Sequence, residues 1–139
     1  MPDTVTAAEA WIARADPDAA HADLWLRSAK ILLLPLGRVW SAVKVQEHDG
    51  LAAAAEVSGP VIHDPAGRRV FFLVPTNAGW GYPATELLGD TCWLTVPAPS
   101  VTEPPGPHWI SPPDGSGLLV DVRQLRAALV ARAEAGQAQ

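Results

Sequence analysis

Residues 61–74 read Val-Ile-His-Asp-Pro-Ala-Gly-Arg-Arg-Val-Phe-Phe-Leu-Val, and this stretch decides the class of fold. Two runs rich in β-branched and aromatic residues flank the sequence Asp64-Pro65-Ala66-Gly67. Proline at the second position of a turn and glycine at its end are typical of a tight turn between two paired strands. The stretch therefore predicts a β-hairpin over Val61–Val74 at the centre of a sheet.

Other short apolar runs indicate the remaining strands. Ile31–Pro35 is unbroken and ends at a proline, which is typical of a strand buried on both faces. The valines and the tryptophan between residues 39 and 45 follow a tight turn and indicate the next strand. Further strands are predicted at Cys92–Val96, Trp109–Ile110 and Leu118–Val120. We expect Cys92–Val96 to lie with the hairpin at the centre of the sheet.

Seven prolines lie between Pro97 and Pro113. Proline cannot donate to a strand ladder and protects sheet edges, so this segment is expected to form a rigid loop over an edge. The spacing of Pro104 and Pro107 also fits a polyproline II ligand, which is the alternative interpretation.

Two helices are predicted before the first strand. Thr6 followed three residues later by Glu9 is a capping-box pattern, and it predicts a helix over Ala7–Ala15. Asp18 or a neighbouring residue can cap a second helix that runs toward Leu26.

Two more helices are predicted later in the chain. Four consecutive alanines place one over Glu47–Val57, and Asp121 can cap the other, with Gln124 at the third position of a capping box. Residues 134–139 lack apolar anchors and should fray. Because helices and strands do not alternate regularly, we predict one α+β domain over 1–139. An antiparallel or mixed β-sheet should be flanked by the N- and C-terminal helices.

Composition excludes several classes of protein. The chain has 139 residues, of which 48% are hydrophobic and 18% charged, as in globular domains. Cys92 is the single cysteine, so no intramolecular disulfide can form and a reducing compartment fits best. The start of the chain is acidic, unlike a signal peptide, and the longest apolar stretch, Ile31–Leu36, is too short to span a bilayer. We therefore expect a cytoplasmic protein without membrane contact.

Charge disfavours nucleic acid as the partner. The formal net charge is −5, and sequence-independent binding to polyanions comes from neutralising phosphates with Lys and Arg. Six of the ten cations nevertheless lie between residues 27 and 69, so a local basic face is possible if folding brings them together. They are Arg27, Lys30, Arg38, Lys44, Arg68 and Arg69.

Two groups of polar residues were considered as reactive sites. Asp16, Asp18, His21 and Asp23 could surround a divalent cation, or they could be acids at the positive end of a helix dipole. His63 and Asp64 could form a catalytic pair at the mouth of the hairpin, or Asp64 could begin its turn. We favour the structural interpretation in both cases, and no HExxH, Walker or G-x-S-x-G motif nominates a nucleophile. The prediction is no metal, no cofactor and no catalytic residue.

Three stretches carry a resemblance to a known family. They are Leu32-Leu33-Leu34-Pro35-Leu36, Ala66–Pro75 and Glu86–Asp90 continuing through Trp93–Ser100. Residues 31–111 thereby resemble the N-terminal domain of bifunctional DNA primase-polymerases, in the archaeo-eukaryotic primase superfamily. The chain is also similar to a set of small proteins of high-GC bacteria that share the Leu-Pro-Leu-Gly and Val-Pro patterns and the Pro-Pro-Asp-Gly-Ser-Gly close.

The resemblance implies a scaffold that has lost its chemistry. The family needs paired carboxylates to hold metals, a histidine on the aromatic strand and a later acid. Here Lys44 lies where the metal ligands are required, Arg69 lies where the histidine would be, and Glu86 is at best a replacement for the late acid. We therefore predict a degenerate, non-catalytic relative. The alternative is a metal-dependent nucleotide-binding or nucleotidyl-transferring enzyme with a residual acidic site at Asp64, Glu86 and Asp90.

The chain should then act as a binding or regulatory module. A protein partner or a homo-oligomer is expected in preference to nucleic acid, with a small ligand or nucleotide as the alternative. Of the six tryptophans, Trp11, Trp40, Trp93 and Trp109 fall inside predicted elements and are expected in the core. The predicted contact surface is the loop Gly79-Trp80-Gly81-Tyr82 together with Arg68 and Arg69, because arginine forks and an aromatic ring between glycines suit a partner. In the alternative arrangement Trp80 packs inward as a lid on the sheet.

Overall fold

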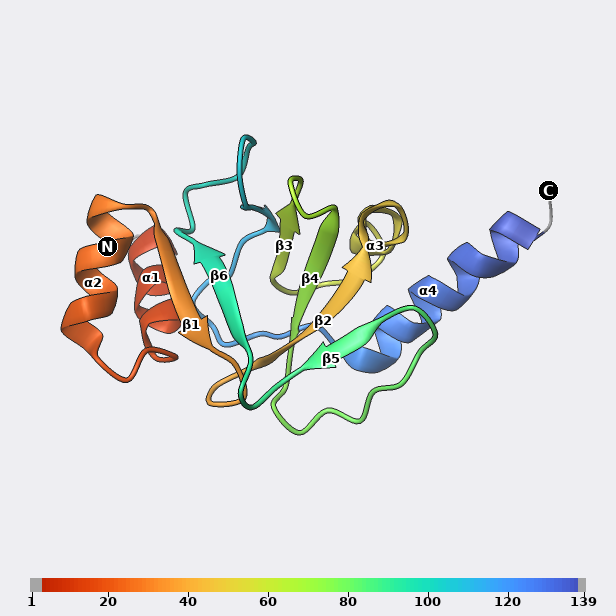
Figure 1. Ribbon diagram of the computed structural model, residues 1–139, viewed down its shortest axis with the longest axis horizontal. Coiled ribbons are helices and arrows are strands. Elements are labelled where there is room, and N and C mark those ends of the chain that lie inside the picture. Colours follow the sequence, from red (N-terminus) through yellow and green to blue (C-terminus); the bar gives the residue numbers. More distant parts are fainter. Residues whose placement is uncertain (1–3, 138–139) are drawn as a thin grey trace.

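The computed structural model describes residues 4–137 and confirms the predicted α+β class, with antiparallel sheets flanked by helices (Figure 1). The helices are α1 (Thr4–Ala13), α2 (Ala19–Ser28), α3 (Glu47–Ala54) and α4 (Val122–Gln137). The strands are β1 (Ile31–Pro35), β2 (Ser41–Gln46), β3 (Val61–Asp64), β4 (Arg69–Val74), β5 (Glu86–Leu88), β6 (Trp93–Pro97) and β7 (His108–Ser111). None of the described helices is long and apolar enough to cross a membrane.

The larger sheet has five strands in the order β5-β2-β4-β3-β7, and every neighbouring pair is antiparallel. The predicted hairpin is present as β3 and β4, with Val61 opposite Phe72 and Asp64 opposite Arg69. Asp64 accepts a hydrogen bond from the amide of Gly67, at 3.3 Å, inside the turn. The sequence therefore predicted both the hairpin and its place at the centre of this sheet.

The second sheet is a two-stranded ribbon of β1 and β6, with Leu33 opposite Thr95. The prediction that Cys92–Val96 lies at the centre of the hairpin's sheet was wrong. The edge of β3 is taken by β7 and the edge of β2 by β5, so β6 pairs with β1 outside that sheet. β5 was not predicted, because three residues give too short a run for an alternating pattern.

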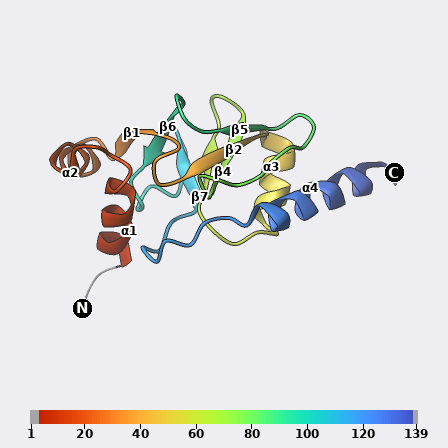
Figure 2. The same ribbon diagram turned by 90° about the horizontal axis from the view of Figure 1, so that it is seen from below.

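Two hydrophobic cores lie on opposite faces of the five-stranded sheet. One core joins α1, α2 and the inner side of the ribbon to part of one sheet face, and it contains the stacked rings of Trp11 and Trp40, 4.4 Å apart. The other core joins the opposite face to α3 and α4 through Leu125 and Leu129. Figure 2 shows α3 and α4 on the same side of the strands, so these two helices cover only one face of the sheet.

Two predictions about strands were wrong. Ile31–Pro35 was expected to be buried on both faces, but burial alternates along β1 and the side chain of Leu33 is exposed. Leu33 stays exposed because the ribbon packs on the core with its other side, through Leu32 and Leu34. Leu118–Val120 is not a strand; the amide of Val120 donates to the carbonyl of Leu73, and α4 begins two residues later.

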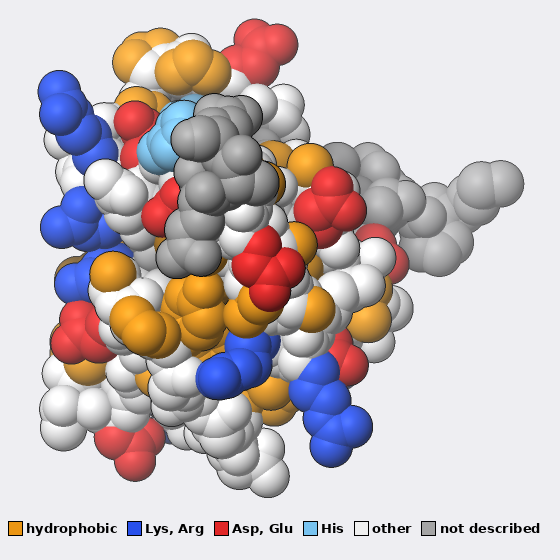
Figure 3. Space-filling model, turned by 90° about the vertical axis from the view of Figure 1, so that its right-hand side faces the viewer, with side chains coloured by type: hydrophobic (Ala, Val, Ile, Leu, Met, Phe, Trp, Pro, Cys, Tyr) orange, Lys and Arg blue, Asp and Glu red, His pale blue; other side chains and the backbone are white. Residues whose placement is uncertain are grey.

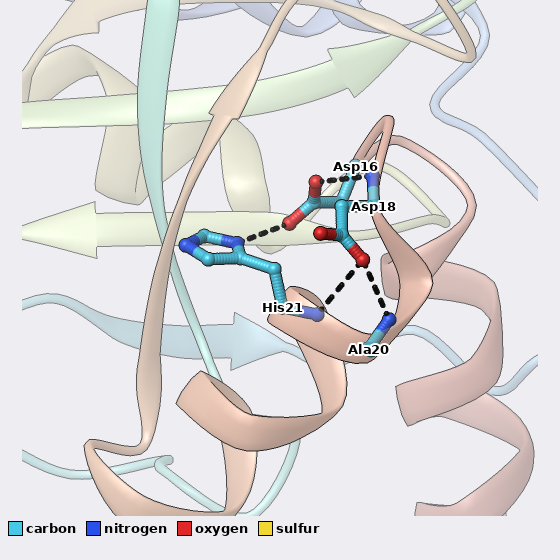
Figure 4. A network of polar contacts seen from close by, with 4 residues as sticks. All are labelled: Asp16, Asp18, Ala20 and His21. Atoms are coloured by element: carbon cyan, nitrogen blue, oxygen red, sulfur yellow. Dashed lines mark hydrogen bonds and ion pairs between the residues drawn. The ribbon is translucent and has the colours of Figure 1, made fainter.

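Two of the described helices, α2 and α4, begin directly after an aspartate that caps them. Asp18 caps α2 by accepting hydrogen bonds from the amides of Ala20 and His21 (Figure 4). Asp121 caps α4 by accepting from the amide of Arg123 at 2.8 Å. Both caps were predicted, since an aspartate ahead of a helix satisfies amides that have no partner within it.

Other helix predictions need correction. α1 already includes Thr4, so Thr6 is not its N-cap residue, and α3 ends at Ala54 rather than at Val57. Gln124 accepts a hydrogen bond from the amide of Ser58 instead of completing a capping box. α4 is helical as far as Gln137, and residues 138–139 lie outside the described part of the chain, so the fraying of residues 134–139 stays a prediction.

Glycine is required where α3 crosses the sheet. A Cβ atom at Gly50 would lie 2.5 Å from the Cβ of Val70 in β4, closer than real side-chain contacts come. The absence of a side chain therefore sets how closely α3 can approach the central strand.

We predict that Gly50→Ala lowers the free energy of unfolding by about 1–2 kcal/mol, although alanine favours an isolated helix by up to about 1 kcal/mol. Chemical denaturation measures this. The loss should shrink in part in a Val70→Ala background, which removes the two methyl groups at 2.8 and 3.3 Å but keeps the Cβ atom at 2.5 Å. Gly81→Ala is the matched control, because nothing lies within 4 Å of its added carbon. Stabilisation by Gly50→Ala would contradict the close approach.

Candidate functional site

The candidate site lies on the sheet face that α3 and α4 leave uncovered, which is the face toward the β1–β6 ribbon (Figures 1 and 2). We call this surface the open face. In the five-stranded sheet one row across it runs Glu86, Lys44, Phe71 and Ile62, because these residues are opposite one another in register. The ribbon β1–β6 packs against part of this sheet face through Leu94 and Val96 and leaves the rest open to solvent.

A hollow of about 260 Å³, the apolar hollow, lies between the ribbon and the open face. Its walls are mainly the side chains of Phe71, Leu88, Trp93 and Thr95. Lys44 and Asp64 also line it, so one cation and one anion border an otherwise apolar depression. Its size suits one large side chain or one ring.

A second hollow of about 300 Å³, the polar hollow, shares Lys44 with the first and extends toward the edge strand β5. Arg69, Gln46, Thr85 and Glu86 line it. The Nζ atom of Lys44 lies 2.9 Å from Oε1 of Glu86, which is its cross-strand partner. This ion pair is partly exposed, so it is worth at most about 1 kcal/mol, and it separates the two hollows.

Trp93 is the functional candidate that sequence reasoning missed. It was expected in the core, but its side chain is 58% exposed at the edge of the apolar hollow, and Leu33 on the same side of the ribbon is 57% exposed. The alternation of β6 signals that Trp93 and the pair Leu94 and Val96 lie on opposite sides of the strand, and packing on the core decides which side is exposed. Burying a tryptophan stabilises a fold strongly, so an exposed one marks a surface available to a partner.

The predicted contact loop Gly79–Tyr82 is held against the protein. Trp80 packs on the core beneath α3 and α4, and its indole nitrogen donates to the hydroxyl of Thr85 at 3.0 Å. Arg126 of α4 donates to the carbonyl of Gly81 at 2.6 Å, and its guanidinium carbon lies 5.7 Å from the centre of the Tyr82 ring. Trp80 and Tyr82 thus hold the β4–β5 loop in place, which is the lid arrangement.

The two predicted arginines lie where the hairpin turn meets β4 and do not line the same surface. Arg69 lines the polar hollow, whereas Arg68 lies in the turn with a positive φ of 55° and lines neither hollow. The six cations between residues 27 and 69 do not converge, because Arg27 and Lys30 lie at the end of α2 and Arg38 in the β1–β2 turn. Figure 3 shows Lys and Arg side chains spread from its left edge to its lower right, with Asp and Glu side chains between them.

The three acids of the alternative site are far apart. Asp64 and Glu86 are on strands separated by two others, a distance of about 14 Å at the usual strand spacing. Asp90 lies by the β1–β2 turn, where a side chain at Gly37 would collide with its carboxylate. Among residues 4–137 no three His, Cys, Asp or Glu side chains are grouped so that they could hold a metal ion.

The first acidic group forms a helix start, as favoured. Figure 4 shows Asp16 beside His21, with Oδ2 of the former 2.8 Å from Nδ1 of the latter. Asp16 also accepts from the amide of Asp18, which caps α2, so both acids order the α1–α2 connection. The side chain of Asp23 lies outside the described part of the chain.

A polar cluster on the opposite side of the hairpin was also missed. Nε2 of His63 lies 2.7 Å from Oε2 of Glu47, and its ring centre lies 4.9 Å from that of His108, its cross-strand partner. His108 is only 6% exposed, and its Nδ1 lies 2.9 Å from the carbonyl of Gly106. Because neighbouring residues in a strand face opposite ways, His63 and Asp64 cannot form the catalytic pair considered above.

We predict that alanine substitution lowers stability much more at Trp80 than at Trp93. Trp80→Ala should lower the free energy of unfolding by about 2 kcal/mol, because it removes a half-buried ring and its hydrogen bond. Trp93→Ala should change it by less than about 1 kcal/mol, because its ring is mostly in solvent. Thermal and urea unfolding measure both. A larger loss at Trp93 than at Trp80 would mean that Trp93 is structural.

The open face combines an exposed indole, an apolar depression and separated cations, an arrangement that can bind but that offers no activated nucleophile. Its parts come from β2, β4, β5 and β6, so it exists only in the folded chain. No family model, no curated protein and no solved structure matches this chain.

Proposed function

We propose that this chain is a non-catalytic binding or regulatory module on a degenerate primase-polymerase-like scaffold, and that its open face receives a protein partner or a second copy of the chain. The observation that carries the proposal is the 58% exposed side chain of Trp93 at the edge of the apolar hollow. Aromatic side chains at the centre of an interface supply a large share of binding energy, particularly beside a pocket that excludes water.

The charge of Lys44 supports a non-catalytic role. In the resembled domains this part of the strand should provide carboxylates for metals, whereas here an ammonium group lies on the open face and is paired with Glu86. A metal ion would be repelled by this cation. Restoring the chemistry would need a new set of ligands rather than one substitution.

The balance of charge supports a protein partner over nucleic acid. The two hollows are lined by two cations, Lys44 and Arg69, and two anions, Asp64 and Glu86. A nucleic-acid surface needs an excess of cations to release counterions from phosphates, and the chain as a whole carries a net charge of −5.

A second candidate function is binding of a nucleotide or small planar ligand. The observation in its favour is the position of Trp93 close to Lys44, because an indole can stack on a base while a cation meets a phosphate. This candidate differs from the first in requiring metal-dependent affinity for nucleoside triphosphates.

We predict that Trp93→Ala abolishes association while the fold persists. If the partner is a second copy, light scattering should give a dimer for the wild type and a monomer for the variant. If the partner is another protein, photo-crosslinking from Thr95 should yield an adduct that the variant loses. Trp25→Ala is the matched control, since that tryptophan is 44% exposed on α2 and lines neither hollow.

Calorimetric titration with ATP and Mg²⁺ or Mn²⁺ distinguishes nucleotide binding, the second candidate function, from protein binding, the first. Tight binding that requires the metal and is lost on Glu86→Ala would overturn the protein-binding proposal. Equal association of the wild type and Trp93→Ala would also overturn it.

A further inference from the structure

We propose that the open face recognises an extended acidic peptide segment in which a large apolar side chain and a carboxylate are two residues apart. This inference rests on the proposed function and adds the chemistry of the partner. The apolar side chain would enter the apolar hollow beside Trp93, and the carboxylate would meet Arg69 in the polar hollow.

The spacing of the hollows comes from β4. Phe71 lines the apolar hollow and Arg69 the polar hollow, and these residues are two apart on the same face of one strand. Side chains two apart on a strand are separated by roughly 6.5–7 Å. An extended ligand lying along β4 has the same repeat. Two of its side chains, two residues apart, can therefore enter one hollow each while the ligand backbone stays extended.

The apolar hollow selects the anchor. Its volume of about 260 Å³ is close to that of one large side chain, and the rings of Phe71 and Trp93 form two of its walls. The Trp93 ring would lose most of its exposed area on binding. Burying this ring and filling the hollow require a side chain as large as that of leucine or phenylalanine.

Arg69 selects the carboxylate, because every other charge in the two hollows already has a partner. Lys44 is paired with Glu86 at 2.9 Å, and Asp64 accepts from the amide of Gly67 in the turn. Arg69 donates to the carbonyl of Arg68 at 3.3 Å, and no described carboxylate lies within ion-pair distance of it. A guanidinium with free donors on an exposed surface matches the two oxygens of a carboxylate.

The net charge of the chain does not prevent this contact. At physiological ionic strength, charges more than about 8 Å apart are largely screened. The arginine next to the carboxylate therefore outweighs acids elsewhere on the molecule. The long-range repulsion should appear as weaker binding at low salt.

The test uses fluorescein-labelled peptides and fluorescence anisotropy with the full chain. The reference probe is Gly-Ser-Phe-Ser-Asp-Ser-Gly, and the comparison probes replace its Asp by Asn or its Phe by Ala. We expect the reference probe to bind about tenfold more tightly than either comparison probe. Arg69→Gln should weaken the Asp probe to the level of the Asn probe and leave the Asn probe unchanged.

Arg68→Gln is the matched control, because it removes a neighbouring charge that lines neither hollow. The inference is overturned if the Asp and Asn probes bind equally, or if Arg68→Gln and Arg69→Gln have the same effect. If no probe binds but Trp93→Ala still abolishes dimerisation or the Thr95 crosslink, the peptide class is wrong and the proposed function stands. If Trp93→Ala also has no effect, both proposals fail.

Discussion

The structure depends on one strand whose two faces belong to two different cores. In β4, Val70, Phe72 and Val74 face α3 and α4, while Phe71 and Leu73 face the side of the ribbon. Burying each of these side chains contributes about 1.5–3 kcal/mol, so the strand is held from both sides. A shift of β4 by one residue would exchange the side chains on its two faces and disrupt both cores. The two cores therefore fix the register in which β4 pairs with β2 and β3.

The open face follows from where the helices can pack. Gly50 lets α3 approach Val70 closely, and α4 lies beside it on the same side of the sheet. The opposite sheet face shares a core with the two-stranded ribbon, α1 and α2, and these elements cover only part of it. The uncovered part begins where β4 emerges from the turn, so the arginine and phenylalanine of the hollows are positioned by the central strand of the five-stranded sheet. Such support favours a preorganised site.

The charged residues on this face contribute little to the stability of the fold. The Lys44–Glu86 pair is partly exposed and contributes little to folding, but it neutralises both groups and leaves Arg69 as the free cation. The Trp80–Thr85 and Arg126–Gly81 hydrogen bonds fix the β4–β5 loop that forms the outer wall of the polar hollow. Most charged groups in the two hollows are therefore already ion-paired or hydrogen-bonded, and Arg69 is the one without a carboxylate partner among the described residues.

Local chemistry in the sequence determined the hairpin, the caps at Asp18 and Asp121 and the α+β class, because turns and caps are satisfied by residues a few positions apart. Only the tertiary structure decided that β6 pairs with β1, that Trp93 faces solvent and that His63 meets Glu47 and His108. Strand partners distant in sequence are chosen by which edges the rest of the chain leaves free. A side chain's exposure depends on what packs over it, and neither can be read from neighbours along the chain.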